Sequence, residues 1–152
     1  KAVSFYEALQ PEFIEYQKQL LVNSKAFCQT FINKGAKVIS GLTQNHLFSI
    51  DVKTTYGLTG KQCEDILHTL NITINKNSIP FDTEKPTTTS GIRLGTAAMT
   101  SRGFKEDEFI IIANLIDKAL REPENLILHN VIRKEIAKLT HMFPIVRKYI
   151  EK

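Results

Sequence analysis

Arg93 is the side chain in this sequence best suited to hold a ligand. It stands between Ile92 and Leu94, so on an extended strand it points to the face opposite those two apolar side chains. A guanidinium offers a rigid fork of donors that matches a carboxylate in bidentate geometry. The flanking Gly91 and Gly95 leave room for a ligand or another backbone to approach. The spacing alone also fits an edge-strand arginine paired with a surface carboxylate, so both interpretations stay open.

A long polar loop precedes this strand. Two short alternating runs, 72–74 and 92–94, are typical of strands, and between them lie Pro80 and Pro86. Loops of this length are uncommon in compact domains unless they are functional or disordered. The first residues of the loop carry side chains that bind ligands rather than fill a core, namely Asn75, Lys76, Asn77 and Ser78. Asparagine also bonds nearby backbone in turns, so a structural role for Asn75 and Asn77 is the alternative.

The elements that position these residues follow from the hydrophobic pattern. Residues 1–9 indicate the end of a helix, and Pro11 suits the first turn of a new one. That second helix, at 12–33 with Gly35 as its left-handed cap, is roughly 30 Å long. The other predicted elements are strands at 37–40 and 47–52 joined as a hairpin, a helix from Thr59 with a capping box at Gln62, a helical turn at 96–101, and helices at 106–122 and 124–143.

The order of these elements predicts the fold class. Helices and short strands alternate along the chain, and the connections favour antiparallel pairing. We therefore expect a two-layer α/β (α+β) sandwich, in which a small, mostly antiparallel sheet carries helices on one face.

Composition limits the class of protein. The 152 residues are 42% hydrophobic and 24% charged, with a formal net charge of +4, an ordinary globular composition. No apolar run approaches the roughly 20 residues that span a bilayer, and the N-terminal residues lack a signal-peptide pattern, so we expect a cytoplasmic protein. Cys28 and Cys63 lie in helical patterns and are predicted to be buried, reduced thiols. The four histidines form no close metal-ligand cluster, and we assign no metal.

Positive charge gathers near the C-terminal end, at Arg133, Lys134, Lys138, Arg147, Lys148 and Lys152. A basic helix of this kind can bind RNA. A solvated helix face is the simpler interpretation, because no aromatic stacking platform accompanies these charges. A non-catalytic RNA-binding module remains an alternative function.

Three successive motifs resemble one enzyme family. They read Asn-Lys-Asn-Ser-Ile-Pro-Phe-Asp (75–82), Thr-Ser-Gly-Ile-Arg-Leu-Gly-Thr (89–96) and Thr-Ser-Arg-Gly-Phe-Lys-Glu (100–106). Together with segments at 1–13, 40–47 and 57–61, they resemble the C-terminal region of serine hydroxymethyltransferase over roughly residues 1–122.

The resemblance implies a fold and an activity. The family has the aspartate aminotransferase fold and depends on pyridoxal phosphate, and it interconverts serine and glycine with transfer of a one-carbon unit to or from tetrahydrofolate. The cofactor lysine of the family stands in a threonine-rich segment ending His-Lys, which this sequence lacks. We therefore expect residues 1–10 to end a helix of a large domain and residues 11–152 to form the C-terminal small domain. Catalysis is expected only from the full-length homodimer or tetramer.

The resemblance also assigns site residues. Arg93 matches the arginine that binds the substrate carboxylate. Asn77 matches the asparagine that binds the folate pterin, and Lys76 and Ser78 are expected to line the entrance of the same folate site. The alternative enzyme is a related pyridoxal-phosphate aldolase of hydroxy amino acids, which would keep the arginine but would not need the 75–82 motif.

Overall fold

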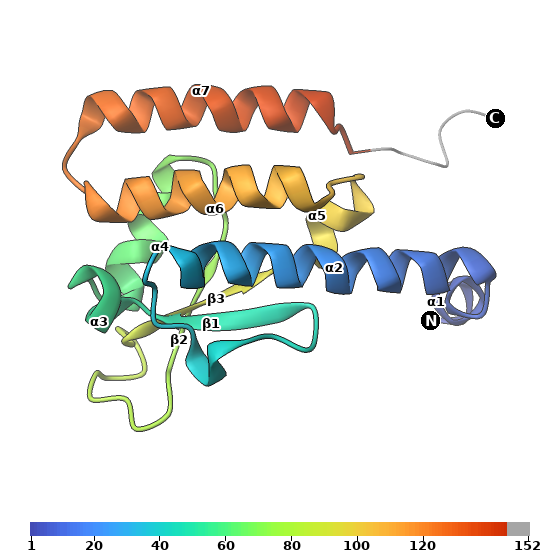
Figure 1. Cartoon of the computed structure of the whole chain (residues 1–152), viewed down its shortest axis with the longest axis horizontal. Helices are drawn as coiled ribbons and strands as arrows, with labels where there is room; N and C mark the ends of the chain where they lie inside the picture. The colour runs from blue at the N-terminus through green and yellow to red at the C-terminus, as the bar shows by residue number, and fades with distance from the viewer. Residues whose placement is uncertain (146–152) are drawn as a thin grey trace.

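Helices stack on one side of a small sheet (Figure 1) in the computed structural model, which describes residues 1–145. Strands β1 (Leu47–Asp51), β2 (Asn75–Asn77) and β3 (Gly91–Gly95) pair antiparallel in the order β1-β3-β2. The helices are α1 (Ala2–Ala8), α2 (Pro11–Asn33), α3 (Val52–Tyr56), α4 (Gly60–Thr69), α5 (Ala97–Ser101), α6 (Glu106–Arg121) and α7 (Leu126–Met142). The predicted two-layer fold is confirmed.

The two faces of the sheet differ sharply. Phe48 and Ile50 of β1 and Ile92 and Leu94 of β3 are buried against the helices. Because successive strand residues point to opposite faces, the residues between them, Arg93 among them, face away from the helices. The open face is thus left for polar side chains.

Phenylalanine rings join the helices to the sheet. The ring of Phe27 on α2 lies 5.4 Å from that of Phe48 on β1 and 5.3 Å from that of Phe109 on α6, measured between centroids. Such pairs add about 0.5–1.5 kcal/mol each beyond the burial of their area. They hold the strands that carry the open face against a packed helical layer.

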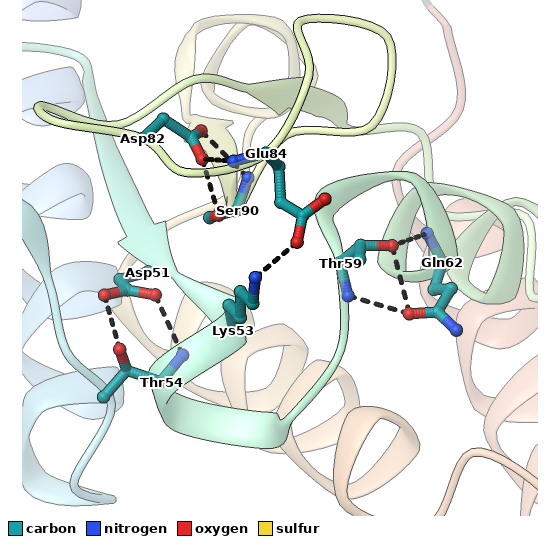
Figure 2. Close-up of polar contacts among 8 residues, drawn as sticks. All are labelled: Asp51, Lys53, Thr54, Thr59, Gln62, Asp82, Glu84 and Ser90. Atoms are coloured by element: carbon teal, nitrogen blue, oxygen red, sulfur yellow. Dashed lines mark hydrogen bonds and ion pairs between the residues drawn. The ribbon is translucent and has the colours of Figure 1, made fainter.

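The first residue of α4 packs closely against the start of β3. Thr59 and Gln62 form the predicted capping box (Figure 2), and the Gly60 N–H donates to Thr89 O at 2.9 Å. A β-carbon at Gly60 would lie 2.3 Å from the oxygen of Gly91. Only glycine allows this approach, so α4 fixes where β3 begins.

Two predicted strands are wrong. In the 37–40 segment, Val38 makes only an isolated bridge to Ile50, because a 3-10 turn follows and Ser40 takes a φ of 69°. The predicted hairpin is therefore reduced to that one bridge. The second short strand lies at Asn75–Asn77 rather than at 72–74, since pairing with β3 outweighs the low strand propensity of Asn and Lys.

Helix α3 was not predicted. The sequence pattern extended the strand to Val52, but the Asp51 side chain accepts a hydrogen bond from Thr54 N at 2.9 Å. An aspartate in this position caps a helix, so the strand ends there and a short helix begins.

Both cysteines are buried and free, as predicted. Burial raises the pKa of each thiol, that of Cys63 to about 12. Within residues 1–145, no helix is long and apolar enough to cross a membrane, and no His, Cys, Asp and Glu side chains gather as a metal-binding group. The basic residues Arg147, Lys148 and Lys152, on which an RNA-binding role partly depended, lie outside the described residues.

Candidate active site

A row of three polar residues crosses the open face of the sheet, with Arg93 at its centre. In the antiparallel register, Arg93 pairs with Ser49 on β1 and with Asn75 on β2. Directly opposite residues place their side chains on the same face, with β-carbons about 4.5–5.5 Å apart. The sheet therefore brings together a guanidinium, a hydroxyl and an amide, each able to donate a hydrogen bond to an anion.

The Arg93 side chain is exposed and has no protein partner in the described part of the chain. Neither an ion pair nor a side-chain hydrogen bond engages it within residues 1–145. It also lies on the central strand of the sheet, so the alternative of an edge-strand arginine is wrong. A cation placed on a rigid central strand and left unpaired is available to an external carboxylate.

An open cavity of about 370 Å³ lies beside Arg93. This volume is near the lower end of the range for small-molecule sites, about 300–1,000 Å³. No carboxylate and no lysine are among its lining residues, which are His46, Leu47, Thr73, Ile74, Asn75, Arg93 and Gly95. The cavity can therefore take a small molecule that carries a negative charge.

His46 and Thr73 were missed as site residues by the sequence analysis. Each comes just before a strand, and the 72–74 run was expected to be a strand itself. The signal that could have found Thr73 is its alternation with Ile72 and Ile74, which pack against the core and leave the residue between them on the open side.

Asn77 lies on the same face as Asn75, two residues along β2. It pairs with Gly91 in the register. Its Nδ2 donates to the carbonyl oxygen of Ser78 at 2.8 Å. A local bond of this kind is typical of a structural role in a turn, which was the alternative to ligand binding for Asn77. That bond leaves the Oδ1 acceptor of Asn77 without a protein partner within residues 1–145, and Ser78 itself is exposed.

The side chain of Lys76 lies on the other face of the sheet from those of its sequence neighbours. Strand alternation places it on the face opposite Asn75 and Asn77, where its Nζ lies 3.1 Å from Glu64 on α4. Hydrogen bonds from Lys76 hold the pKa of the Glu64 carboxyl below its usual range. To contact a ligand on the open face, the ammonium group would have to leave this pair.

The loop between β2 and β3 is held by Asp82 (Figure 2). This carboxylate accepts hydrogen bonds from Ser90 Oγ at 2.6 Å, Ser90 N at 3.0 Å and Glu84 N at 2.9 Å, and from Ile79 N at 3.2 Å. Desolvation opposes ionisation, but these donors hold the pKa of Asp82 well below its usual range. The loop is thus closed on itself next to Asn77 and Ser78.

A second contact ties this loop to the helical side of the molecule. Lys53 of α3 forms an ion pair with Glu84 (Figure 2). The N-cap of α3 is Asp51, which is also the last residue of β1. The loop is therefore linked to β1 through α3 and to the start of β3 through Ser90.

A sheet with helices on one face and an unpaired arginine on the other defines an α/β domain whose open face offers a cation to an anionic ligand. The comparison with known families names it more closely: the chain belongs to the serine hydroxymethyltransferase family, whose model matches residues 1–116.

Individual members of this family align with nearly the whole chain. The chain is 75% identical to the serine hydroxymethyltransferase of Metamycoplasma arthritidis over 152 residues, which is 100% of this chain and 36% of the relative. It is 51% identical to that of Mesoplasma florum, over 95% of this chain and 35% of the relative. It is also 51% identical to a probable serine hydroxymethyltransferase of Mesomycoplasma hyopneumoniae, over 98% of this chain and 36% of the relative. The chain thus spans about a third of the length of these relatives.

Proposed function

We propose that this chain is the C-terminal part of a pyridoxal-phosphate-dependent serine hydroxymethyltransferase. The whole enzyme would interconvert serine and glycine and pass a one-carbon unit to or from tetrahydrofolate, as a cytoplasmic homodimer or tetramer. Residues 1–10 would end a helix of the large domain, and residues 11–152 would form the small domain. The observation that carries the proposal is the unpaired Arg93 on the central strand of a chain that belongs to this family.

Arg93 binds the carboxylate of the amino-acid substrate in this proposal. Its fork can donate to both carboxylate oxygens, while Ser49 and Asn75 lie on either side of it in the register. Anchoring the carboxylate fixes the orientation of the bonds at Cα, and orientation of this kind supplies a large part of an enzymatic rate. Arginine also stays charged at every relevant pH.

Asn77 and Ser78 bind the folate in this proposal, and Lys76 joins them only after its ammonium group leaves Glu64. The free Oδ1 of Asn77 can accept from the pterin ring, and the Nδ2 hydrogen that does not bond Ser78 O can donate to it. The loop held by Asp82 presents these residues in one conformation, which lowers the entropy lost on binding.

Pyridoxal phosphate would supply the electron sink for this chemistry, and in this proposal it is bound mainly by the large domain. No lysine lines the cavity beside Arg93, and Lys76 is paired with Glu64. We therefore assign the cofactor site to other residues of a longer protein. The 152 residues alone are expected to be inactive.

Kinetics of Arg93 variants in the complete enzyme test the proposal. Arg93→Ala should lower kcat/KM for serine by roughly 100-fold or more, because the substrate loses its orienting contact. Arg93→Lys should restore only part of this, since a point charge lacks the fork. Arg133→Ala is the control, because it removes a guanidinium from α7 that bonds Thr69 and Asn130. Near-normal kcat/KM in the Arg93→Ala enzyme would refute the assignment.

A further inference from the structure

A second cavity, of about 330 Å³, lies on the helical side of the sheet. Apolar cavities of about 150 Å³ already hold a benzene-sized molecule, so this one has room for a longer apolar ligand. Its apolar lining comes from α2, β3, the segment before β2, and α5, α6 and α7, and includes Ile72, Ile74, Met99, Ile112, Ile136 and Leu139.

Arg102 gives this cavity a charged end. No Asp or Glu is among the lining residues. Arg93 also borders the cavity, but its side chain belongs to the opposite face of the sheet. Arg102 is thus the cation that a ligand in this cavity would meet.

The Arg102 guanidinium is held in place and only partly used. Its Nε donates to Phe143 O at 2.7 Å and its Nη2 to Thr140 O at 3.0 Å. Its Nη1 reaches only the Met99 sulfur, at 4.0 Å. An arginine has five N–H donors, so several remain for an acceptor, and the two carbonyl bonds already fix the plane in which they point.

We propose that this cavity binds a small amphipathic carboxylate, such as a fatty acid of about eight carbons. The apolar chain lies among the isoleucine and leucine side chains, and the carboxylate bonds the free edge of the Arg102 guanidinium. The choice of ligand rests on charge complementarity, because the lining offers a fixed cation and apolar walls without an acid. The cavity shares Thr73, Ile74, Arg93 and Gly95 with the one on the open face, whereas Arg102 and the helical walls line it alone. The inference does not depend on the proposed serine and folate sites.

Calorimetric titration of the 152-residue chain with octanoate tests the proposal. We expect saturable binding of one octanoate per chain. Hexanoate, which is two methylenes shorter, should bind about 15-fold more weakly, because each buried methylene contributes roughly a factor of four. 1-Octanol should also bind at least roughly tenfold more weakly, because it lacks the charge that bonds Arg102. Equal affinity for octanol and octanoate, or no saturable binding of octanoate, would overturn the proposal.

Three substitutions locate the site. Ile112→Trp fills the cavity without touching Arg102 and should abolish octanoate binding, while Ile111→Trp, on the same helix but outside the lining, should leave it unchanged. Arg102→Gln should weaken binding at least roughly tenfold. Because Arg102 also holds the end of α7, the melting temperature of each variant is measured alongside. Unchanged binding in a folded Ile112→Trp chain would place the ligand elsewhere and refute the site.

Discussion

Asn75 on β2 lies directly opposite Arg93 on β3, on the open face of the sheet. The amide is neutral, so it borders the guanidinium without occupying it. A carboxylate at the same position would stand at the distance at which opposite charges on paired strands attract each other. The neutrality of residue 75 therefore keeps Arg93 available to a ligand.

Asn75→Asp should place a carboxylate in the complete enzyme that competes with the substrate for Arg93. The new carboxylate would pair with Arg93 and compete with the substrate, so KM for serine should rise at least roughly tenfold, as for loss of one charge-assisted hydrogen bond. Asn75→Ala should change KM for serine much less, because it adds no competing charge. Steady-state kinetics with varied serine measure both. Equal effects of the two substitutions would mean that Arg93 does not bind the substrate carboxylate.

Asn77→Ala should separate the two proposed subsites. Removal of the amide takes away an acceptor and donor for the pterin, so KM for tetrahydrofolate should rise roughly tenfold, as for loss of one or two hydrogen bonds. KM for serine should stay within about twofold. Kinetics in which each substrate is varied in turn provide the measurement. A rise in KM for serine alone would move Asn77 out of the folate site.

The two glycines that flank Arg93 should respond differently to alanine. A β-carbon at Gly91 would lie 2.8 Å from Asn77 O and 2.5 Å from Ile79 Cγ2, whereas at Gly95 the nearest atom is 3.6 Å away. Gly91→Ala should therefore lower the free energy of unfolding by about 1–3 kcal/mol. Gly95→Ala should be neutral or stabilise by up to about 1 kcal/mol. Urea unfolding of the two variants decides this, and a similar loss in both would contradict the close packing at Gly91.

Asp82→Asn should lower the free energy of unfolding at pH 7 by about 1–2 kcal/mol, because an amide cannot accept from Ser90, Glu84 and Ile79 together. The pKa of Asp82 is lower in the folded chain than in the unfolded one. Its stabilising contribution is thus complete above the unfolded pKa of about 3.9 and is lost as pH falls through the folded value.

Urea unfolding at several pH values measures this difference. The gap between the wild-type chain and Asp82→Asn should be constant near neutral pH and shrink below about pH 4. Glu124→Gln, at an exposed residue before α7, serves as the control and should show no such gap. A gap that grows on acidification would mean that Asp82 is not a charged anchor of the loop.

The parts of the fold that the sequence predicts well depend on local chemistry. Gln62 stands three residues after Thr59, and this spacing alone locates the start of α4. The period of apolar residues gives α2 and α6 to within two residues of their observed bounds. Arg93 is predicted to face away from the core because strand alternation requires only its two neighbours.

The parts that could not be predicted depend on contacts between distant residues. Asn75 and Asn77 look like loop residues, and they form a strand only because β3 pairs with them. The central position of β3, which leaves Arg93 without an edge role, is likewise set by tertiary pairing. Lys76 was grouped with its neighbours in sequence, whereas strand alternation and Glu64 place it on the other face.

Helix α1 and its C-cap, Leu9, expose apolar side chains that the rest of the described chain does not cover. The exposed fractions are 66% for Val3, 69% for Phe5, 67% for Tyr6 and 82% for Leu9. No residue of α1 is buried, and the extended backbone of Gln10 separates α1 from α2. An exposed apolar cluster of this kind is an association site, and we propose that it packs against the large domain or a second subunit of the complete enzyme.

Amide hydrogen exchange tests the proposed domain boundary at residue 10, with the 152-residue chain measured at low concentration. Residues 2–8 should exchange rapidly, because an uncovered two-turn helix is barely stable in water, while the amides of Phe109–Leu120 in α6 stay protected. In the complete enzyme, the same α1 amides should become protected by at least roughly 100-fold, as expected when a segment gains tertiary packing. Protection of α1 equal to that of α6 in the 152-residue chain would show that residues 1–10 belong to this domain. That result would contradict the proposed division at residue 10.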